Sequence, residues 1–478
     1  MIRIECRDAL YAYDIYHITK AFFPNEEIEQ QVDEKQEQEV SVTLENGSCF
    51  SIAPDGVAGF SEKKERKHWV NKQLYNFCRQ EQGHPLAWGI LTGIRPTKMI
   101  MSRLESGAGE RDALEWMTEE YLVTGEKAEL ALAIAKREKA LLDRLDYREG
   151  YSLYIGIPFC PTICSYCSFS SSPLEEWEDR VDGYLDALCR ELSFVGTVSA
   201  ERKLNTIYIG GGTPTTLNPQ QLERLLSHLE QTFSYENLIE FTVEAGRPDS
   251  ITREKLEVLK SHPVTRISIN PQSMQQKTLD AIGRRHTVQE IYDAYEAARE
   301  LGFDNINMDL IAGLPGEEVC DMRDTLEQIV HMQPDSLTVH SLAIKRAARM
   351  GQEKTKIREA KRLEEMVDLA SDYAKRLELV PYYLYRQKNI AGNFENVGYA
   401  KVDKAGIYNI LIMEEKQSII ACGAGASTKI VLSEKIELES RGKLRTTNII
   451  RIENVKDIEE YITRIDEMIE RKGEWLWH

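Results

Sequence analysis

From residue 150 onward, short apolar runs of strand length alternate with amphipathic stretches of helix length. The runs are YSLYIGI (151–157), LNTIYIGG (204–211), LIEFTVEA (238–245), VTRISIN (264–270), NINMDLIAGL (305–314) and DSLTVHSLA (335–343). A repeat of strand and helix with right-handed crossovers builds a parallel sheet that curls into a full or partial barrel. Ligands of such sheets bind at the carboxyl ends of the strands. The pattern predicts an α/β fold with a partial (βα)6 barrel over residues 151–345.

The two flanking regions have different patterns. Residues 1–150 combine a period-two alternation, EVSVTLENGSCFSI (39–52), with helix-like stretches, which predicts an N-terminal α+β domain. Its segment GILTGIRPTKMI (89–100) is either a binding loop carrying Arg95 and Lys98 or a structural turn leading into a helix. Residues 346–478 are first helical and charged, then strand-like, which predicts a C-terminal α+β subdomain that closes over the barrel.

Composition and charge narrow the class of protein. The chain has 478 residues, 42% of them hydrophobic and 29% charged, as in a globular protein. Its 78 acidic and 60 basic residues give a formal charge of −18, which opposes the phosphate neutralisation that nucleic-acid binding requires. No uncharged apolar run is long enough to span a bilayer. We expect a cytoplasmic monomer that binds neither nucleic acid nor membranes.

Three cysteines, Cys160, Cys164 and Cys167, lie within eight positions of GIPFCPTICSYCSF (156–169). The alternatives are structural zinc, a redox dithiol, an iron–sulfur cluster and coincidence. Zinc commonly takes four ligands in two pairs, and the sequence has no second cysteine pair. A CxxC dithiol leaves Cys160 idle. A 4Fe–4S cluster held by three thiolates keeps one iron open, which the amino and carboxylate groups of S-adenosylmethionine can chelate before an electron cleaves its sulfonium bond.

Four further segments include the ends of these strand runs: GGGTPT (210–215), TVEAGRP (242–248), RISINPQS (266–273) and NMDLIAGLPGE (307–317). The glycines let backbone N–H groups approach a carboxylate or a ribose, although a plain turn also explains them. Glu244 and Asp309 either bind the amino group or ribose hydroxyls of the cofactor, or are helix caps and surface acids. Gln272 and Arg284 offer hydrogen-bond donors, or form a solvated polar pair.

The cysteine motif CxxxCxxC, with Tyr166 before its last cysteine, resembles the signature of the radical S-adenosylmethionine superfamily. The wider stretch YIGIPFCPTICSYCSF (154–169) resembles the oxygen-independent coproporphyrinogen III oxidase branch, whose members read YxHIPFCxxxCxYCxF. The four segments above agree with that branch in order and spacing, over about 200 residues. The overall layout, with LTGIRPTK (91–98) and LYRQKNIAGNFENVGY (384–399), is most similar to its coproporphyrinogen dehydrogenase group.

The resemblance implies a role for each matching position. Cys160, Cys164 and Cys167 correspond to the cluster ligands, and no residue is assigned a catalytic role of its own. The contacts to the cluster-bound S-adenosylmethionine correspond to Tyr154, Gly211 and Glu244. A second S-adenosylmethionine in the family implies contacts at Tyr166, Gly212, Thr213, Gln272, Arg284, Asp309 and Ala343.

The implied reaction is oxidative decarboxylation of two propionate side chains of coproporphyrinogen III to vinyl groups, which gives protoporphyrinogen IX in haem biosynthesis. The implied partners are the tetrapyrrole and a reduced flavodoxin or ferredoxin as electron donor. The basic side chains that offer to pair with propionates are Lys345, Arg346, Arg349, Arg386 and Lys388.

Three departures from the branch bear on the substrate: Gly156 replaces a histidine, NPQ (270–272) replaces GVQ, and the N-terminal 150 residues are unlike the usual short arm. One rival function is a radical methyltransferase or ring-opening enzyme acting on haem. Another is a haem-trafficking chaperone, although no histidine occurs between His340 and His478. The last is a barrel that binds a cluster without turnover.

Overall fold

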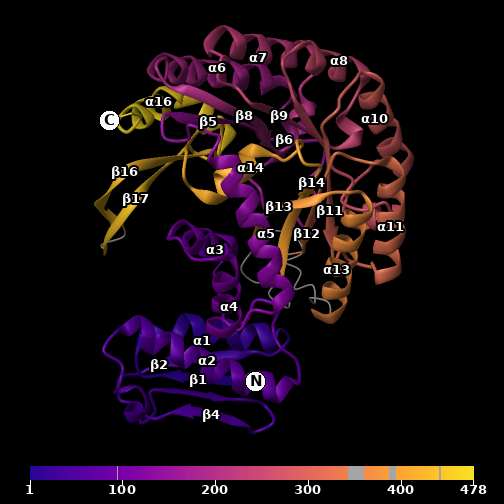
Figure 1. Cartoon of the computed structure of the whole chain (residues 1–478). Coiled ribbons are helices and arrows are strands. Elements are labelled where there is room, and N and C mark those ends of the chain that lie inside the picture. Colours follow the sequence, from indigo (N-terminus) through magenta and orange to yellow (C-terminus); the bar gives the residue numbers. More distant parts are fainter. Residues whose placement is uncertain (94, 343–359, 387–393, 441–442, 478) are drawn as a thin grey trace.

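The computed structural model describes residues 1–93, 95–342, 360–386, 394–440 and 443–477. These residues form a small sheet near the N-terminus and a large curved sheet surrounded by helices (Figure 1). No helix within these ranges is long and apolar enough to cross a membrane.

The small sheet has the strand order β2 (Ile28–Val32), β1 (Ile2–Cys6), β3 (Val40–Thr43), β4 (Cys49–Ile52). Helices α1 (Ala9–Phe22) and α2 (Lys63–Gln82) cover one face (Figure 1). Alternate residues of β1, namely Ile2, Ile4 and Cys6, are buried against these helices, as the period-two pattern requires. The alternating segment 39–52 forms β3 and β4.

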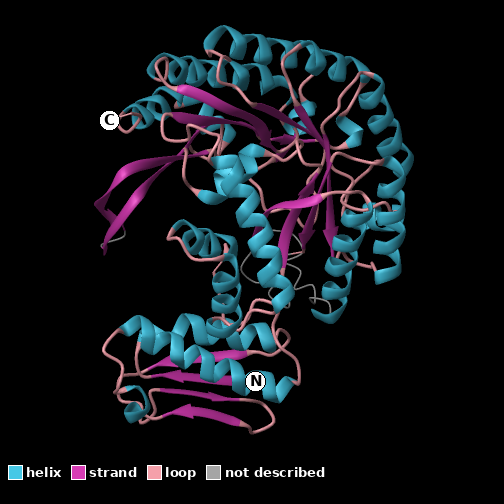
Figure 2. Cartoon of the chain, in the orientation of Figure 1, coloured by secondary structure: helices cyan, strands magenta, loops and turns pink. Residues whose placement is uncertain are grey.

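The large sheet contains the six predicted strands, side by side and parallel. They are β5 (Gly150–Ile157), β8 (Lys203–Gly211), β9 (Glu240–Gly246), β10 (Arg266–Ile269), β11 (Ile306–Ala312) and β12 (Ser336–Ser341). Helices follow them on the outer face (Figures 1 and 2): α6 (Val181–Val198), α7 (Pro219–Thr232), α8 (Arg253–Ser261), α10 (Val288–Glu300), α11 (Val319–Met332) and α13 (Ala360–Arg376). The short helix α9 (Gln276–Ala281) lies between β10 and α10 in the chain. The predicted α/β fold with an incompletely closed barrel is confirmed.

The C-terminal strands extend the same sheet at both edges. They are β13 (Val380–Arg386) and β14 (Glu395–Ala400) beside β12, and β15 (Ser418–Cys422), β16 (Ser427–Ser440) and β17 (Lys443–Glu453) beside β5. Helices α15 (Ile458–Thr463) and α16 (Ile465–Gly473) follow. Helix α14 (Ile407–Glu414) joins the two edges, and its first N–H groups, from Ile407 and Tyr408, donate to the Glu240 carboxylate at 2.5 and 3.2 Å.

Three further helices, α3 (Pro96–Glu105), α4 (Glu110–Glu120) and α5 (Gly125–Leu142), pack into the core of the large sheet. Arg137 of α5 donates to Val380 O at 2.8 Å and to Lys401 O at 2.9 Å, which attaches this helix to the β13–β14 edge. Leu86 and Ile90 belong to the small core, whereas Trp88 belongs to the large one. The division of the chain at residue 150 stays a prediction.

Candidate active site

The three cysteines lie in a loop after the carboxyl end of β5. A short parallel pairing of β6 (Phe159–Cys160) with β7 (Ser172–Pro173) closes the base of this loop. Within it, Thr162 Oγ1 donates to Gly283 O at 3.0 Å, in the turn after α9. The cysteine loop is therefore attached to a second loop at the same end of the sheet.

The three thiols are close enough to interact electrostatically. Burial raises the pKa of Cys160 and Cys167, and the neighbouring Cys164 adds to the rise in both. Thr213 Oγ1 donates to Cys160 Sγ at 3.6 Å. In the described part of the chain, no group of three His, Cys, Asp or Glu side chains is arranged to hold a metal ion. A four-iron cluster makes a different demand, since each thiolate binds a separate iron.

The glycines at the end of β8 allow it to run against the cysteine loop. Gly212 N–H donates to Ile157 O at 2.7 Å, and a Cβ at Gly212 would lie 2.4 Å from Phe159 O. Gly211 has a φ of 108°, and its Cβ would lie 3.3 Å from Tyr154 Oη. Close backbone approach thus requires Gly212, and the backbone angle favours glycine at Gly211.

Glu244 lies on the concave face of the sheet, where Tyr208 Oη donates a hydrogen bond to its Oε1. Burial raises the pKa of Glu244 to about 7, the Tyr208 hydrogen bond opposes this rise, and the charge of Asp309 adds to it. A carboxyl group with a pKa near neutral pH can ionise there, and its carboxylate form accepts hydrogen bonds from an ammonium group or a ribose.

An aromatic group lies beside Glu244. Tyr208 stacks on Tyr408 of α14 with ring centroids 4.5 Å apart, and Tyr154 lies 6.2 Å from Tyr208 and 6.4 Å from Tyr408. Burial raises the pKa of all three phenols, so they stay neutral hydrogen-bonding groups. The C-terminal region thus contributes Tyr408 to the concave face.

Gln272 and Arg284 approach the site from the loops after β10 and α9. Gln272 has a φ of 65°, its N–H donates to Asp309 O at 2.9 Å, and its buried Oε1 has no partner among the described residues. Arg284 donates to Asn270 O and, at 3.4 Å, to Tyr166 Oη, whereas its buried Nε has no partner within the described ranges. Buried polar atoms without partners point to a missing ligand.

Asp309 accepts a hydrogen bond from Asn307 Nδ2 at 2.7 Å, and its Oδ2 lies 3.8 Å from His340 Nε2. Burial favours its neutral form, but the neighbouring side chains of His340, Asn307 and Thr338 lower the pKa of Asp309 overall. Asp309 is therefore an ionised acceptor on the concave face.

The positions of five predicted site residues are not described by the structure. Ala343, Lys345, Arg346, Arg349 and Lys388 lie outside the described residues.

Two predicted basic groups are used in contacts within the protein. Arg386 is buried, and its guanidinium donates to Leu91 O at 3.0 Å and to Gly93 O at 3.2 Å. Arg95 donates to Met413 O at 2.5 Å and pairs with Glu415 at 2.8 Å, just before α3 begins. These contacts favour the structural turn for the segment 89–100.

No site role was predicted for Tyr208, Tyr408, Arg247 or His340. Tyr208, Arg247 and His340 lie within the strand runs and strand-end segments of the sequence, so their position was a signal. Tyr408 reaches the site from helix α14, far along the chain, and no local pattern indicates it.

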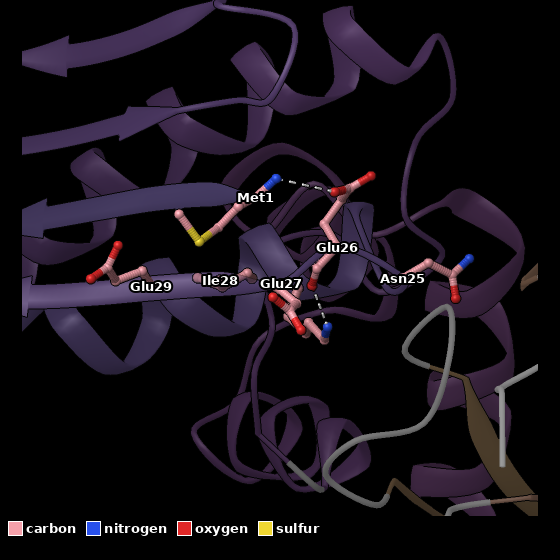
Figure 3. A pocket seen from close by; sticks show the side chains of 7 residues that line it. Met1, Asn25, Glu26, Glu27, Ile28 and Glu29 are labelled. Atoms are coloured by element: carbon pink, nitrogen blue, oxygen red, sulfur yellow. Dashed lines mark hydrogen bonds and ion pairs between the residues drawn. The ribbon is translucent and has the colours of Figure 1, made fainter. Parts of the chain in front are cut away.

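A pocket of about 650 Å³ lies at the small sheet and contains none of the predicted site residues (Figure 3). Within it, the Met1 amino group lies 3.7 Å from the Glu26 carboxylate, and Lys20 Nζ donates to the backbone carbonyl of Glu26 at 2.8 Å. These contacts use both cations that line the pocket.

Comparison with known proteins agrees with this geometry. A sequence profile of the Radical SAM superfamily matches residues 154–329. The "oxygen-independent coproporphyrinogen-III oxidase-like protein HemZ" of Bacillus subtilis (strain 168) is 42% identical over 419 residues, covering 86% of this chain and 81% of that protein. The chain belongs to this HemZ-like family of coproporphyrinogen oxidase-like proteins within the radical SAM superfamily.

Other relatives match a smaller share of the chain. The heme chaperone HemW of B. subtilis (strain 168) is 37% identical over 40% of this chain and 50% of its own length. The oxygen-independent coproporphyrinogen III oxidase of Escherichia coli (strain K12) is 32% identical over 40% of this chain and 42% of its own length. The solved coproporphyrinogen III oxidase HemN from E. coli has a TM-score of 0.53 at 22% identity, over 69% of this chain and 73% of its own, which shows the shared fold.

Membership of the superfamily implies a 4Fe–4S cluster and S-adenosylmethionine. The residues present fit these groups, because three adjacent thiols, a glycine-lined strand end and the unpaired buried atoms of Gln272 and Arg284 converge at one end of the sheet.

Proposed function

We propose that the protein catalyses the oxygen-independent oxidative decarboxylation of coproporphyrinogen III to protoporphyrinogen IX. The observation that carries this proposal is the cysteine loop at the carboxyl ends of parallel strands whose concave face is polar. The likeness to an oxidase-like relative over 86% of the chain supports coproporphyrinogen as the substrate.

The cofactor contacts are part of the proposal. Cys160, Cys164 and Cys167 bind three irons and leave the fourth open. Tyr154, Gly211 and Glu244 contact the S-adenosylmethionine at that iron. A second S-adenosylmethionine is placed at Tyr166, Gly212, Thr213, Gln272, Arg284 and Asp309, with Ala343 outside the described residues.

The cluster held by Cys160, Cys164 and Cys167, with S-adenosylmethionine, would supply the radical chemistry by which a hydrogen atom β to a propionate carboxylate is removed. Each propionate then loses CO₂ and one further electron, which passes to a one-electron acceptor. The residues of this chain bind and orient the reactants: Glu244 receives a cationic or hydroxyl group of the cofactor, and Arg284 offers its free Nε–H. A reduced flavodoxin or ferredoxin is the proposed electron donor, and the proposed oligomeric state is a monomer.

The test is anaerobic turnover of the reconstituted protein. Dithionite and S-adenosylmethionine are added with and without coproporphyrinogen III, and 5′-deoxyadenosine and tetrapyrroles are followed by mass spectrometry. We expect loss of two CO₂ from the porphyrinogen and formation of 5′-deoxyadenosine. Cys164→Ala should abolish both, whereas Cys189→Ala, which removes a thiol from helix α6, should leave both unchanged.

Two outcomes contradict the proposal in different ways. If 5′-deoxyadenosine forms while the porphyrinogen survives, the radical chemistry stands and the substrate is wrong, and haem is tested next for methylation or ring opening. If neither forms in protein with a full cluster, the protein does not turn over.

A haem chaperone is the second candidate, because HemW is 37% identical over 40% of this chain. The resemblance to HemW covers 40% of the chain, whereas the oxidase-like relative covers 86%, so we favour the enzyme. Stoichiometric haem binding, measured by its absorption spectrum in protein that does not decarboxylate the porphyrinogen, would reverse this preference.

A further inference from the structure

Arg247 lies against the cysteine loop from the end of β9. Its Nη1 donates to Thr162 O at 2.7 Å, to Thr162 Oγ1 at 2.8 Å and to Cys164 Sγ at 3.8 Å. Thr162 lies between the first two cysteines of the motif, so one guanidinium contacts both the backbone of the loop and a thiol.

The other edge of this guanidinium is fixed by Asp249. Arg247 Nε donates to Asp249 Oδ1 at 3.0 Å, and Nη2 donates to Oδ2 at 2.5 Å, a bidentate pair. The Arg247 side chain is 4% exposed. The backbone is fixed as well, since Ser250 Oγ donates to Arg247 O at 2.7 Å. This arginine is therefore oriented before a cluster binds.

The position of Arg247 has an energetic consequence. A buried guanidinium is costly unless its donors are satisfied, and here the donors divide between Asp249 and the cysteine loop. Hydrogen bonds and positive charge directed at cluster sulfur withdraw electron density and raise the reduction potential of an iron–sulfur cluster.

We propose that Arg247 is a positioning residue that pre-forms the cysteine loop and raises the reduction potential of the cluster through its N–H group at Cys164 Sγ. This inference rests on the proposed ligation of the cluster by Cys164. It adds a residue that is not among the cluster ligands or cofactor contacts assigned above.

The test uses the full chain with Arg247→Gln. After anaerobic reconstitution, iron and sulfide are measured per chain, iron release is timed in excess chelator, and the midpoint potential is obtained by redox titration followed by electron paramagnetic resonance. We expect iron release about tenfold faster than in the wild type and a midpoint potential shifted in the negative direction. Arg253→Gln, on the exposed surface of α8, is the matched control and should change neither quantity.

The variant Thr162→Val distinguishes a purely structural role of Arg247 from an effect on the reduction potential. That variant loses the Thr162 Oγ1 contacts to Arg247 and Gly283 but keeps Arg247 at Cys164. We expect faster iron release with an unchanged potential. If Arg247→Gln behaves as Thr162→Val does, the effect on the potential is refuted.

The outcomes remain distinct from those of the proposed function. If the wild-type chain binds no cluster, the proposed function fails at its first step. If the wild type binds one and Arg247→Gln matches it in iron release and potential, this inference alone is wrong. Should Arg247→Gln lose its cluster too fast for titration, Arg247→Lys is titrated instead. A lysine cannot reach Asp249 and Cys164 together, so a wild-type potential in that variant also overturns the inference.

Discussion

Tyr208 is the residue through which the ionisation of Glu244 is adjusted. Burial raises the pKa of Glu244 to about 7, and the hydrogen bond from Tyr208 opposes this rise. Binding of a cationic cofactor group requires the carboxylate, so affinity should fall as pH falls through about 7. Tyr208→Phe removes the hydrogen bond and raises the pKa of Glu244, so we expect the midpoint of S-adenosylmethionine affinity against pH to move to higher pH.

The measurement is anaerobic equilibrium dialysis of S-adenosylmethionine with the reconstituted protein at pH values on both sides of about 7, the raised pKa of Glu244. Tyr408→Phe is the matched control, because Tyr408 belongs to the same stack and no hydrogen bond joins it to Glu244 in the described structure. Equal midpoints in wild type and Tyr208→Phe would show that Tyr208 does not act on Glu244.

The sequence revealed those site residues whose signal is local. Cys160, Cys164 and Cys167 share one loop, and Glu244 ends a recognisable strand. Tyr408 could not be predicted, because its place beside Tyr208 depends on where helix α14 packs. The N–H of Gly212 donates to Ile157 O, a pairing that only the folded backbone decides, whereas the sequence shows only that glycines permit close approach there.

At the scale of elements, a buried ion pair joins the C-terminal helices to the barrel. Lys472 of α16 pairs with Glu191 of α6 at 2.6 Å, and neither side chain is exposed. Tyr461 Oη and Asn454 Nδ2 donate to the same carboxylate at 2.6 and 2.8 Å. Lys472→Met leaves the Glu191 carboxylate buried without its cation, so we expect the free energy of unfolding to fall by about 3–5 kcal/mol in urea denaturation.

The same two helices supply the control for this pair. Arg190 and Asp466 form an exposed ion pair between α6 and α16, with 56% and 81% of their side chains exposed. Exposed pairs contribute little, so Arg190→Gln should change stability by less than about 1 kcal/mol. A Lys472→Met variant as stable as Arg190→Gln would show that hydrogen bonds alone satisfy Glu191.

The strands of the barrel could be predicted because their signal is local, whereas the positions of the C-terminal strands could not. Each of the six parallel strands is an apolar run followed by a helix, a pattern written in consecutive residues. The C-terminal strands were recognised as strand-like, but their attachment to both sheet edges depends on long-range pairing, such as that of Ile420 with Leu153. Edge pairing leaves no periodic signal in the strand itself.

At the scale of the whole molecule, α5 of the N-terminal region and α14 of the C-terminal region meet at two buried carboxyl groups, Glu138 and Glu414. Within the described residues, none of their four oxygens has a hydrogen-bond partner. Burial raises the pKa of both carboxyl groups above the ordinary value of 4.5. For Glu138, the charge of Glu414 adds to this rise. The surrounding charges are Lys416, Lys98, Arg95 and Glu105, of which the three cations oppose the rise.

The sign of the pH dependence follows from this burial. Well below pH 4.5 both carboxyls are protonated in the folded and the unfolded chain. Above it the unfolded chain ionises first, so the free energy of unfolding falls with rising pH, by up to about 1.4 kcal/mol per pH unit for each carboxyl, until the folded pKa is passed.

Glu138→Gln removes one of these titrations and keeps the side-chain shape. We expect little change in the free energy of unfolding at about pH 4, below the ordinary pKa of a glutamate, and a higher free energy of unfolding than in the wild type at about pH 8, with both measured in urea. Glu129→Gln, on the exposed face of α5, should follow the wild type at both pH values. A variant that is less stable than wild type at pH 8 would mean that Glu138 is ionised and paired in the folded protein, and that the junction of α5 and α14 is held by charge rather than by two neutral acids.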